Sequence, residues 1–449
     1  MDAVPFLGRK GPLLSTRTVN FASAIAFIGG STSYSSRTRD RYFPRCYSFT
    51  TRINTLILMR TSVAFALALI TSITFAQDDL IKKISGNKSD TVGFRFTPVI
   101  SAEVTPVEDQ GSSGTCWSYS TGSFLESEMI KRGGEPIHLS KVYMARKSYE
   151  EKAVNFLRMH GSLNYGDGGL GHDVVNMYGK YGAIPQEIYS GLTFGNEENE
   201  FGEMQAVLKG MLDALLKAPN DGKLTPVWRK AFNGVLDAYL GAVPAEFDYK
   251  GKRYTPQTFA KEVVKLDAED YLEFISVNDA PYHTKTTLMV PDNWALQPAW
   301  NIPVEEITTV IDHALRNGYT VAWGGDVSEP TFSWKNGVAF TTMAETDDLT
   351  KEERQNLFKS PQPEPVITSE MRQQAFDNYG TTDDHGMQLT GIATDQNGTE
   401  WYVVKNSWGD TNDYKGYLYM SKPYVQYKTT AFMVNKKGVP GGTLRKIGL

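Results

Sequence analysis

The fold is decided by one short stretch, Gln110-Gly111-Ser112-Ser113-Gly114-Thr115-Cys116-Trp117. Its two glycines interrupt regular structure just before the cysteine. Apolar residues then follow at helical spacing up to the glycine pair at 133 and 134, namely Trp117, Phe124, Leu125 and Met129. The pattern therefore predicts a helix whose first turn carries Cys116. Because the helix dipole and the unpaired N–H groups of the first turn favour a thiolate, Cys116 is a candidate nucleophile.

A nucleophilic thiol needs a stabilised oxyanion and a proton partner. Gln110 can return across the glycine loop and place its amide N–H beside the backbone N–H of Cys116, as the second oxyanion donor. The chain offers six histidines as proton partners: His138, His160, His172, His283, His313 and His385. Only His385 begins a strand-like run that continues into a hairpin whose return ends in an amide.

That hairpin has Asn397-Gly398 at its turn, the strongest short-range hairpin signal. The register expected from this turn places Asn406 opposite Met387, on the same face as His385 and within side-chain reach. Asn406 can then accept a hydrogen bond from one imidazole nitrogen and leave the other facing sulfur, the orienting role in a Cys-His-Asn triad. Trp408 follows two residues later and is placed to shield this bond from water. His172, next to Gly171, is interpreted instead as the start of a packing helix.

Three segments, QGSSGTCWSYS, DDHGMQL and VKNSWGD, resemble the signature segments of the papain-like cysteine peptidases, and in the same order. The run from Asp167-Gly168-Gly169 to Pro185 is also similar to that family. There such a Gly-Gly pair lines the cleft and binds the substrate backbone, which the resemblance implies for Gly168 and Gly169, with Trp408 as a cleft wall. A plain tight turn is the alternative for the two glycines. The implied fold is α+β, with a helical left half and an antiparallel sheet as right half.

Two differences from the usual pattern of that family indicate one of its branches. Ser113 stands where secreted relatives usually have a disulfide cysteine, and His385 follows Cys116 by 269 residues. Both features are similar to the bleomycin hydrolase and aminopeptidase C branch, which implies a helical insertion, aminopeptidase action and ring-like homo-oligomers. In that branch a C-terminal arm fills the cleft. Here only Thr443–Leu449 follow the glycines at 441 and 442, so the arm is expected to fall short and the demand for a free amine to be less strict.

The segments expected along the chain are as follows. Helical spacing dominates residues 200–275, one further helix is expected over Val304–Asn317, and strand-like runs follow it. The predicted organisation is a leader of mis-started translation over 1–58, a signal peptide over 59–76, a linker over 77–96, the left half over 97–189, a mainly helical insertion over 190–303, the right half over 304–434 and a C-terminal tail over 435–449.

The leader and the rest of the chain differ in charge. Residues 1–76 hold nine Lys or Arg and two acids, and the whole chain carries −5, so residues 77–449 carry −12. From Met59 a basic start, the apolar run 63–70 and small residues before Gln77 predict a secretory signal peptide and export. The run is too short for a membrane span. An organellar transit peptide, a disordered tail or a cytoplasmic location are the alternatives.

The net charge and the cysteine count exclude further classes of partner and site. The negative charge disfavours nucleic acid as a partner, and no Cys/His/Asp spacing indicates a metal or another cofactor. Two cysteines, Cys46 and Cys116, occur in the chain, so removal of the leader leaves one thiol and no internal disulfide. The predicted activity is hydrolysis of peptide substrates through a thioester acyl-enzyme. An endopeptidase with an open cleft and a catalytically silent binding protein remain as alternatives.

Overall fold

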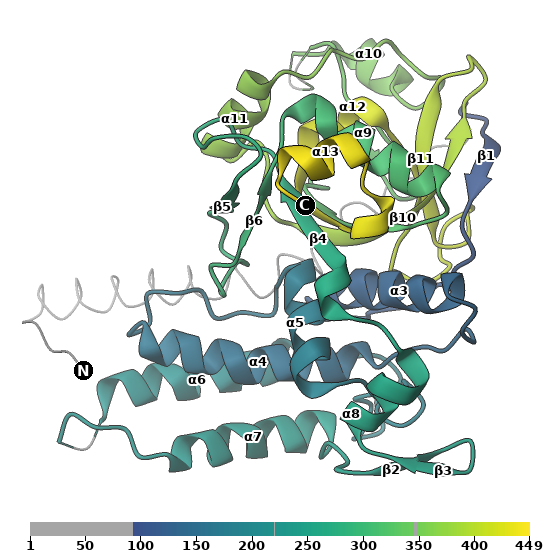
Figure 1. Ribbon diagram of the computed structural model, residues 1–449. Helices are drawn as coiled ribbons and strands as arrows, with labels where there is room; N and C mark the ends of the chain where they lie inside the picture. Colours follow the sequence, from purple (N-terminus) through teal and green to yellow (C-terminus); the bar gives the residue numbers. More distant parts are fainter. Residues whose placement is uncertain (1–92, 220, 345, 347) are drawn as a thin grey trace, which may run out of the picture. The chain divides into compact units, whose positions relative to one another are not determined.

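The computed structural model describes residues 93–219, 221–344, 346 and 348–449, which fall within one compact unit (Figure 1). The leader, the signal peptide and Cys46 lie outside these residues, as does the linker up to residue 92. The described part is α+β, as predicted, with helices gathered in the first half and one large sheet in the second. None of its helices combines the length and the apolar character that crossing a bilayer would require.

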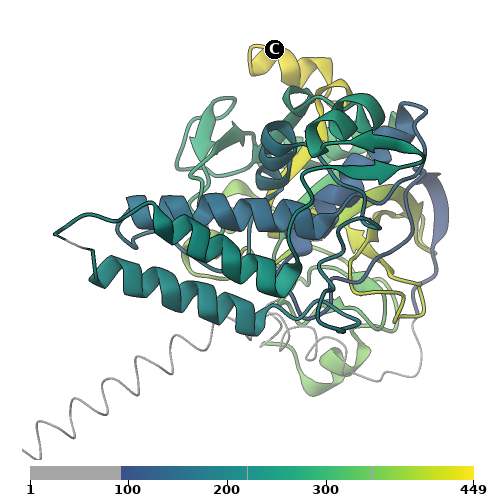
Figure 2. The ribbon, with the colours of Figure 1, turned by 90° about the horizontal axis from the view of Figure 1, so that it is seen from below.

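The helical half packs into one hydrophobic core. Its helices are α3 (Cys116–Lys131), α4 (Lys141–Arg158), α5 (Gly171–Tyr181), α6 (Gly202–Lys217) and α7 (Val227–Leu240). The helical spacing expected after residue 200 is realised in α6, which buries Met204, Leu208 and Leu212 on one face and leaves Val207 exposed. Helices α6 and α7 lie side by side (Figures 1 and 2). Their paired apolar stripes give the insertion a core contact that neither helix has alone.

One sheet of eleven strands organises the second half. Its path is β5-β6-β4-β13-β7-β10-β11-β12-β9-β8, and β1 pairs with β10 outside this path. The strands are β1 (Thr97–Ser101), β4 (Tyr271–Ile275), β5 (Lys285–Thr287), β6 (Pro298–Asn301), β7 (Val321–Gly325), β8 (Phe332–Ser333), β9 (Val338–Ala339), β10 (His385–Thr394), β11 (Glu400–Lys405), β12 (Tyr417–Ser421) and β13 (Thr429–Asn435). Most pairs are antiparallel, and β12–β9 and β4–β6 are parallel. The sheet packs with α9 (Val304–Arg316) and α12 (Lys422–Lys428) in a second core.

The predicted helix over Val304–Asn317 is confirmed as α9, which follows Pro303 and ends before Gly318, where φ is +73°. The remaining α-helices of the described residues are short: α8 (Pro256–Phe259), α10 (Lys351–Asn356), α11 (Ser369–Asp377) and α13 (Gly441–Lys446).

The segment 190–303 is less helical than expected. Its second half contributes a small ribbon of β2 (Phe247–Tyr249) and β3 (Lys252–Tyr254), and then β4, β5 and β6 of the main sheet. These strands hold three to five residues each, too few for an alternating pattern to stand out in sequence. The expectation of a mainly helical segment is therefore wrong beyond α7. There the chain forms strands, and β4 pairs with β13 of the right half.

Helix α3 lies between the two halves, and every residue from Cys116 to Met129 is buried. Its polar side chains therefore need partners inside the protein. On the sheet side, Ser123 Oγ donates to Gln388 Oε1 at 2.7 Å, and Gln388 Nε2 donates to Ser127 Oγ at 2.8 Å. These bonds join α3 to β10 across 265 and 261 residues of sequence. They hold the helix that carries Cys116 against the strand that carries His385.

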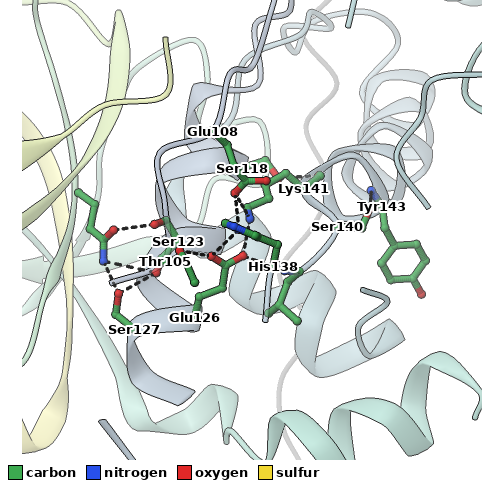
Figure 3. A network of polar contacts seen from close by, with 12 residues as sticks. Thr105, Glu108, Ser118, Ser123, Glu126, Ser127, His138, Ser140, Lys141 and Tyr143 are labelled. Carbon is green, nitrogen blue, oxygen red and sulfur yellow. Dashed lines mark hydrogen bonds and ion pairs between the residues drawn. The ribbon is translucent and has the colours of Figure 1, made fainter. Parts of the chain in front are cut away.

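A second polar network fixes the other side of α3 (Figure 3). The ammonium of Lys141 is hydrogen-bonded to the carboxylates of Glu108 and Glu126, and His138 Nδ1 lies 3.0 Å from Glu108. Glu108, Glu126 and His138 are metal-ligand types gathered within 4.8 Å, but Lys141 already supplies the compensating cation. Although burial raises it, pairing with Lys141 and His138 lowers the pKa of Glu108 to about 2. The network therefore ties the segment before α3 to the beginning of α4 as an ion-paired cluster.

Candidate active site

Cys116 is the first residue of α3, as predicted, and is 6% exposed. The loop before it is fastened to the glycine-rich segment around residue 167. Gly114 N donates to Asp167 Oδ2 at 2.6 Å, and Trp117 Nε1 donates to the carbonyls of Gly114 and Asp167, at 3.1 Å each. A positive φ of +60° at Gly111 allows the chain to turn into this loop. The thiol is thus held at a helix N-terminus by contacts on both sides.

His385 begins β10 and lines the same cavity as Cys116. The close approach depends on Gly386. A Cβ at that position would lie 2.8 Å from Ser120 Oγ and 3.1 Å from the Cα of Trp117, closer than packing allows. Glycine therefore lets the first residues of β10 rest against the first turn of α3, so that His385 and Cys116 line the same cavity.

The β10–β11 hairpin reaches the expected register through a bulge. Near the turn, Thr394 pairs with Glu400, one residue away from the predicted pairing, and the register shifts between Leu389 and Gly391. Beyond the bulge Gln388 pairs with Lys405, so Met387 and Asn406 come next, as predicted. Without the extra residue Asn406 would lie opposite Gln388, three residues from His385, and on the wrong face.

The predicted contact between His385 and Asn406 is present. His385 Nε2 donates to Asn406 Oδ1 at 2.7 Å, and the backbone N–H of Ser407 holds the same oxygen at 2.8 Å. Because Nε2 makes this bond, a proton exchange with Cys116 would involve Nδ1. Trp408 lies against the imidazole with ring centroids 4.6 Å apart and ring planes tilted by 32°, and it is 4% exposed. Burial lowers the pKa of His385 to about 4, against the opposing effect of the Asn406 bond, so the imidazole is a neutral base at neutral pH.

Gln110 is completely buried, and its amide is fixed at both ends. Ser407 Oγ donates to Gln110 Oε1 at 2.7 Å, and Gln110 Nε2 donates to the Ser113 carbonyl at 2.6 Å. A primary amide carries two N–H groups, so the second can point to a developing oxyanion. Ser407 was not predicted from sequence, but its place directly after Asn406 in VKNSWGD is a signal that could have found it.

Of the three residues predicted to contact the substrate, one lines the cavity that holds Cys116 and His385. Gly169 lines it, whereas Gly168 and Trp408 do not. A Cβ on Gly169 would lie 2.9 Å from the ring of Trp117, so glycine is needed for the segment to lie flat against α3. Binding of the substrate backbone at Gly168 and Gly169 remains a prediction.

Acidic residues on the cavity wall were missed. Three of them line it, Glu273, Asp292 and Asp383. Asp383 stands two residues before His385 and was visible in the segment DDHGMQL. Asp292 comes from the loop between β5 and β6, and no local pattern in the sequence connects that loop to the nucleophile.

His172 has a structural role, as interpreted from the sequence. It lies in the first turn of α5, is 1% exposed, and its Nδ1 is 2.7 Å from Glu273 Oε2 on β4. Although burial lowers it, the neighbouring carboxylates of Glu273 and Asp173 raise the pKa of His172 to about 9. The pair is a buried ion bridge between the helical half and the sheet.

Two family models match the chain at the places where the site residues lie. Residues 95–173, which include Gln110 and Cys116, match the papain family cysteine protease model. Residues 243–448, which include His385 and Asn406, match the Peptidase C1-like family model. Together the two matches cover more than half of the chain and both parts of the site.

Curated relatives and a solved structure cover most of the chain. Aminopeptidase C from Lactobacillus delbrueckii subsp. lactis is 23% identical, over 81% of this chain and 87% of the relative. Bleomycin hydrolase from Rattus norvegicus is 24% identical, over 77% and 83%. The crystal structure of PepW from Lactobacillus rhamnosis superposes with a TM-score of 0.61 at 20% identity, over 90% and 95%, and supports the fold. The chain therefore belongs to the papain-like cysteine peptidases, in the branch of the bleomycin hydrolases and aminopeptidases C.

Proposed function

We propose that this protein is a cysteine aminopeptidase in which Cys116, His385, Asn406 and Gln110 carry the chemistry. The observation that supports it most is the meeting, in one cavity, of a thiol at a helix N-terminus with a buried imidazole bonded to an asparagine. Nucleophile, base and orienting group are the set that acyl transfer to sulfur requires. The family and the aminopeptidases among its relatives point to peptide substrates.

Each residue has a distinct step in the proposed reaction. The Cys116 sulfur attacks the carbonyl carbon of the first peptide bond while His385 takes the thiol proton, and the oxyanion forms beside the Cys116 N–H and Gln110. His385 then returns the proton to the leaving amine, which leaves a thioester. Water deprotonated by the same imidazole hydrolyses the thioester and restores the thiol. Asn406 keeps the imidazole oriented through both halves of the reaction.

Matched substrates test the aminopeptidase assignment. Leucyl-aminomethylcoumarin with a free amine is expected to be cleaved with a kcat/KM at least roughly 100-fold above that of its N-acetylated form, because acetylation removes the ammonium group and leaves the polar groups that would bind it unpaired. Fluorescence release by the full chain measures both. Equal rates on the two substrates would favour the open-cleft endopeptidase, and no turnover of either, or of longer peptides, would favour a silent binding protein.

Export is proposed from the sequence of the leader, with the start at Met59 and cleavage before Gln77. N-terminal sequencing of protein isolated from the native host is expected to read from Gln77 or within a few residues of it. A mature protein that retains residues 59–76 would contradict this, and a cytoplasmic location would then be the better assignment. Homo-oligomeric assembly stays a prediction of the family resemblance.

A further inference from the structure

The catalytic cavity holds more acidic side chains than the proposed chemistry uses. Glu273, Asp292 and Asp383 line it together with Cys116 and His385. Glu273 is bonded to His172, so its charge is compensated. The two aspartates take no part in the proton transfers, which leaves their place beside the nucleophile to be explained by substrate binding.

A continuous set of contacts places these aspartates at the cleft. Asp292 lies over Gly168, where a Cβ would come within 1.9 Å of Asp292 Oδ2. The absence of a side chain at Gly168 therefore makes room for the carboxylate. The backbone N–H of Asp292 donates to Asp383 Oδ2 at 3.0 Å, and Asp383 is two residues from His385. The pair thus spans from the glycine segment beside Trp117 to the catalytic histidine.

The loop that carries Asp292 is rigidly anchored. Trp294 Nε1 donates to Asp173 Oδ2 at 2.9 Å, and Asn293 Nδ2 donates to the carbonyls of Leu288 and Gln297 at 2.9 and 3.1 Å. Both Asn293 and Trp294 are buried. The position of the Asp292 carboxylate is therefore set before any ligand arrives.

The carboxyl group of Asp292 has few stabilising contacts in its surroundings. Among the residues that the structure describes, none donates a hydrogen bond to its carboxylate, whereas the nearby Asp173 accepts from Leu170 N and Trp294 Nε1. Lys152 is the neighbouring cation, but its ammonium is hydrogen-bonded to the carbonyls of Gly166 and Gly168. Burial, and then repulsion from Asp383, raise the pKa of Asp292 to about 8, with Asp173 and Asp167 adding to the rise and Lys152 opposing it. A bound cation would stabilise the ionised form.

A buried hydroxyl in the same cavity also lacks a partner. Thr430 is 2% exposed and lines the cavity, and within the described part of the chain its Oγ1 has no hydrogen-bond partner. Buried hydroxyls of this kind are rare unless water or a ligand completes them. The cavity therefore offers a hydrogen-bonding hydroxyl as well as a carboxyl group whose ionised form a cation would stabilise.

From these contacts we propose that Asp292 and Asp383 receive the N-terminal ammonium group of the substrate. This deepens the aminopeptidase function proposed above and rests on it. When the first residue of a substrate is attacked by Cys116, its amine lies roughly 2.5 Å from the reacting carbonyl carbon, so it must sit in this cavity. An ammonium held by one or two carboxylates forms charge-assisted hydrogen bonds, the strong kind.

The C-terminal residues do not reach this place. Val439 and Ile447 are buried against the core that contains α9, and Thr443 Oγ1 donates to Glu306 of α9 at 3.2 Å. None of the residues 436–449 lines the catalytic cavity. Among the described residues, the acids that line the cavity therefore come from the interior of the chain.

Neutral replacements of the two acids test the proposal in the full chain. Asp292→Asn and Asp383→Asn are each expected to lower kcat/KM for leucyl-aminomethylcoumarin by roughly 10- to 100-fold, mainly through KM, because each removes one charge-assisted contact. Cleavage of the N-acetylated form is expected not to fall. Two controls are Asp410→Asn, which removes an equal charge at an exposed position, and deletion of residues 443–449. Both are expected to keep the wild-type preference for a free amine.

The outcomes separate this proposal from the function on which it rests. If the wild type prefers the free amine and the Asp292→Asn/Asp383→Asn double variant keeps that preference, the acids are not the amine site, although the enzyme is an aminopeptidase. If the tail deletion removes the preference instead, the proposal is also overturned. Unchanged rates of Cys116 alkylation by iodoacetamide in each variant show that the site is folded.

A basic side chain of the substrate is the other positively charged group that the two acids could bind. N-acetyl-arginyl-leucyl-aminomethylcoumarin carries its cation one residue further from the scissile bond. The proposal expects this substrate to be cleaved no better than N-acetyl-leucyl-aminomethylcoumarin. Efficient cleavage that is lost in both aspartate variants would assign the acids to a basic second residue and overturn amine recognition.

Discussion

Replacing Cys116 by alanine or serine is expected to abolish hydrolysis of every peptide substrate, with a loss of roughly 10⁴-fold or more in kcat. The reason is that the oxygen of serine is a poor nucleophile without a site built for it, and alanine has none. The measurement is fluorescence release from leucyl-aminomethylcoumarin at high enzyme concentration. Because the substitution is small and the side chain lies at a helix start with few bonds to lose, the thermal unfolding midpoint is expected to stay close to that of the wild type.

Cys46→Ala, made in the uncleaved chain, is the matched control, since that chain has two cysteines and the other is Cys46 of the leader. It is expected to retain wild-type kinetics and the wild-type stoichiometry of inactivation by iodoacetamide. Turnover by Cys116→Ala near the wild-type rate would remove Cys116 from the mechanism. Loss of turnover in Cys46→Ala would point to a second essential thiol, for which the proposed mechanism has no place.

The beginning of α3 could be predicted because the local sequence signals around it agree. Glycines before Cys116 and apolar residues at helical spacing after it agree on the same boundary, and α3 begins there. The contact between His385 and Asn406 was also predictable, although the strand register that produces it was not. The bulge between Leu389 and Gly391 compensates for a turn register that differs by one residue, and nothing in the sequence around Thr390 marks an inserted residue.

The strands β4, β5 and β6 were missed because a strand of three to five residues carries too little alternation to be read. Because these strands were not predicted, the place of Asp292 at the cavity could not be predicted either. Asp292 lies in the loop between β5 and β6, which reaches Gly168. That contact joins positions more than a hundred residues apart, and it depends on tertiary anchors such as the bond from Trp294 to Asp173. Local sequence patterns carry information on elements, whereas this acid reaches the cleft through the packing of several elements at once.

Removal of the base is the second large effect. His385→Ala is expected to lower kcat by several orders of magnitude, because in a nucleophile–base pair the loss of either member costs nearly as much as the loss of both. Stopped assays with leucyl-aminomethylcoumarin measure the residual rate. His160→Asn is the control, since His160 is an exposed histidine with φ of +52°, a backbone conformation that asparagine tolerates.

The pH profile adds a readout that a merely structural role would not move. Burial lowers the pKa of His385 to about 4, so the imidazole is an available base at every pH above that value. The acid limb of kcat at saturating substrate is therefore expected near pH 4, with activity rising as the pH increases through it. Asn406→Ala removes the bond that opposes the lowering, so it is expected to shift this limb further down while reducing kcat. An acid limb near the ordinary histidine value of about 6.5 would show that the imidazole is exposed to water during turnover, against the shielding by Trp408.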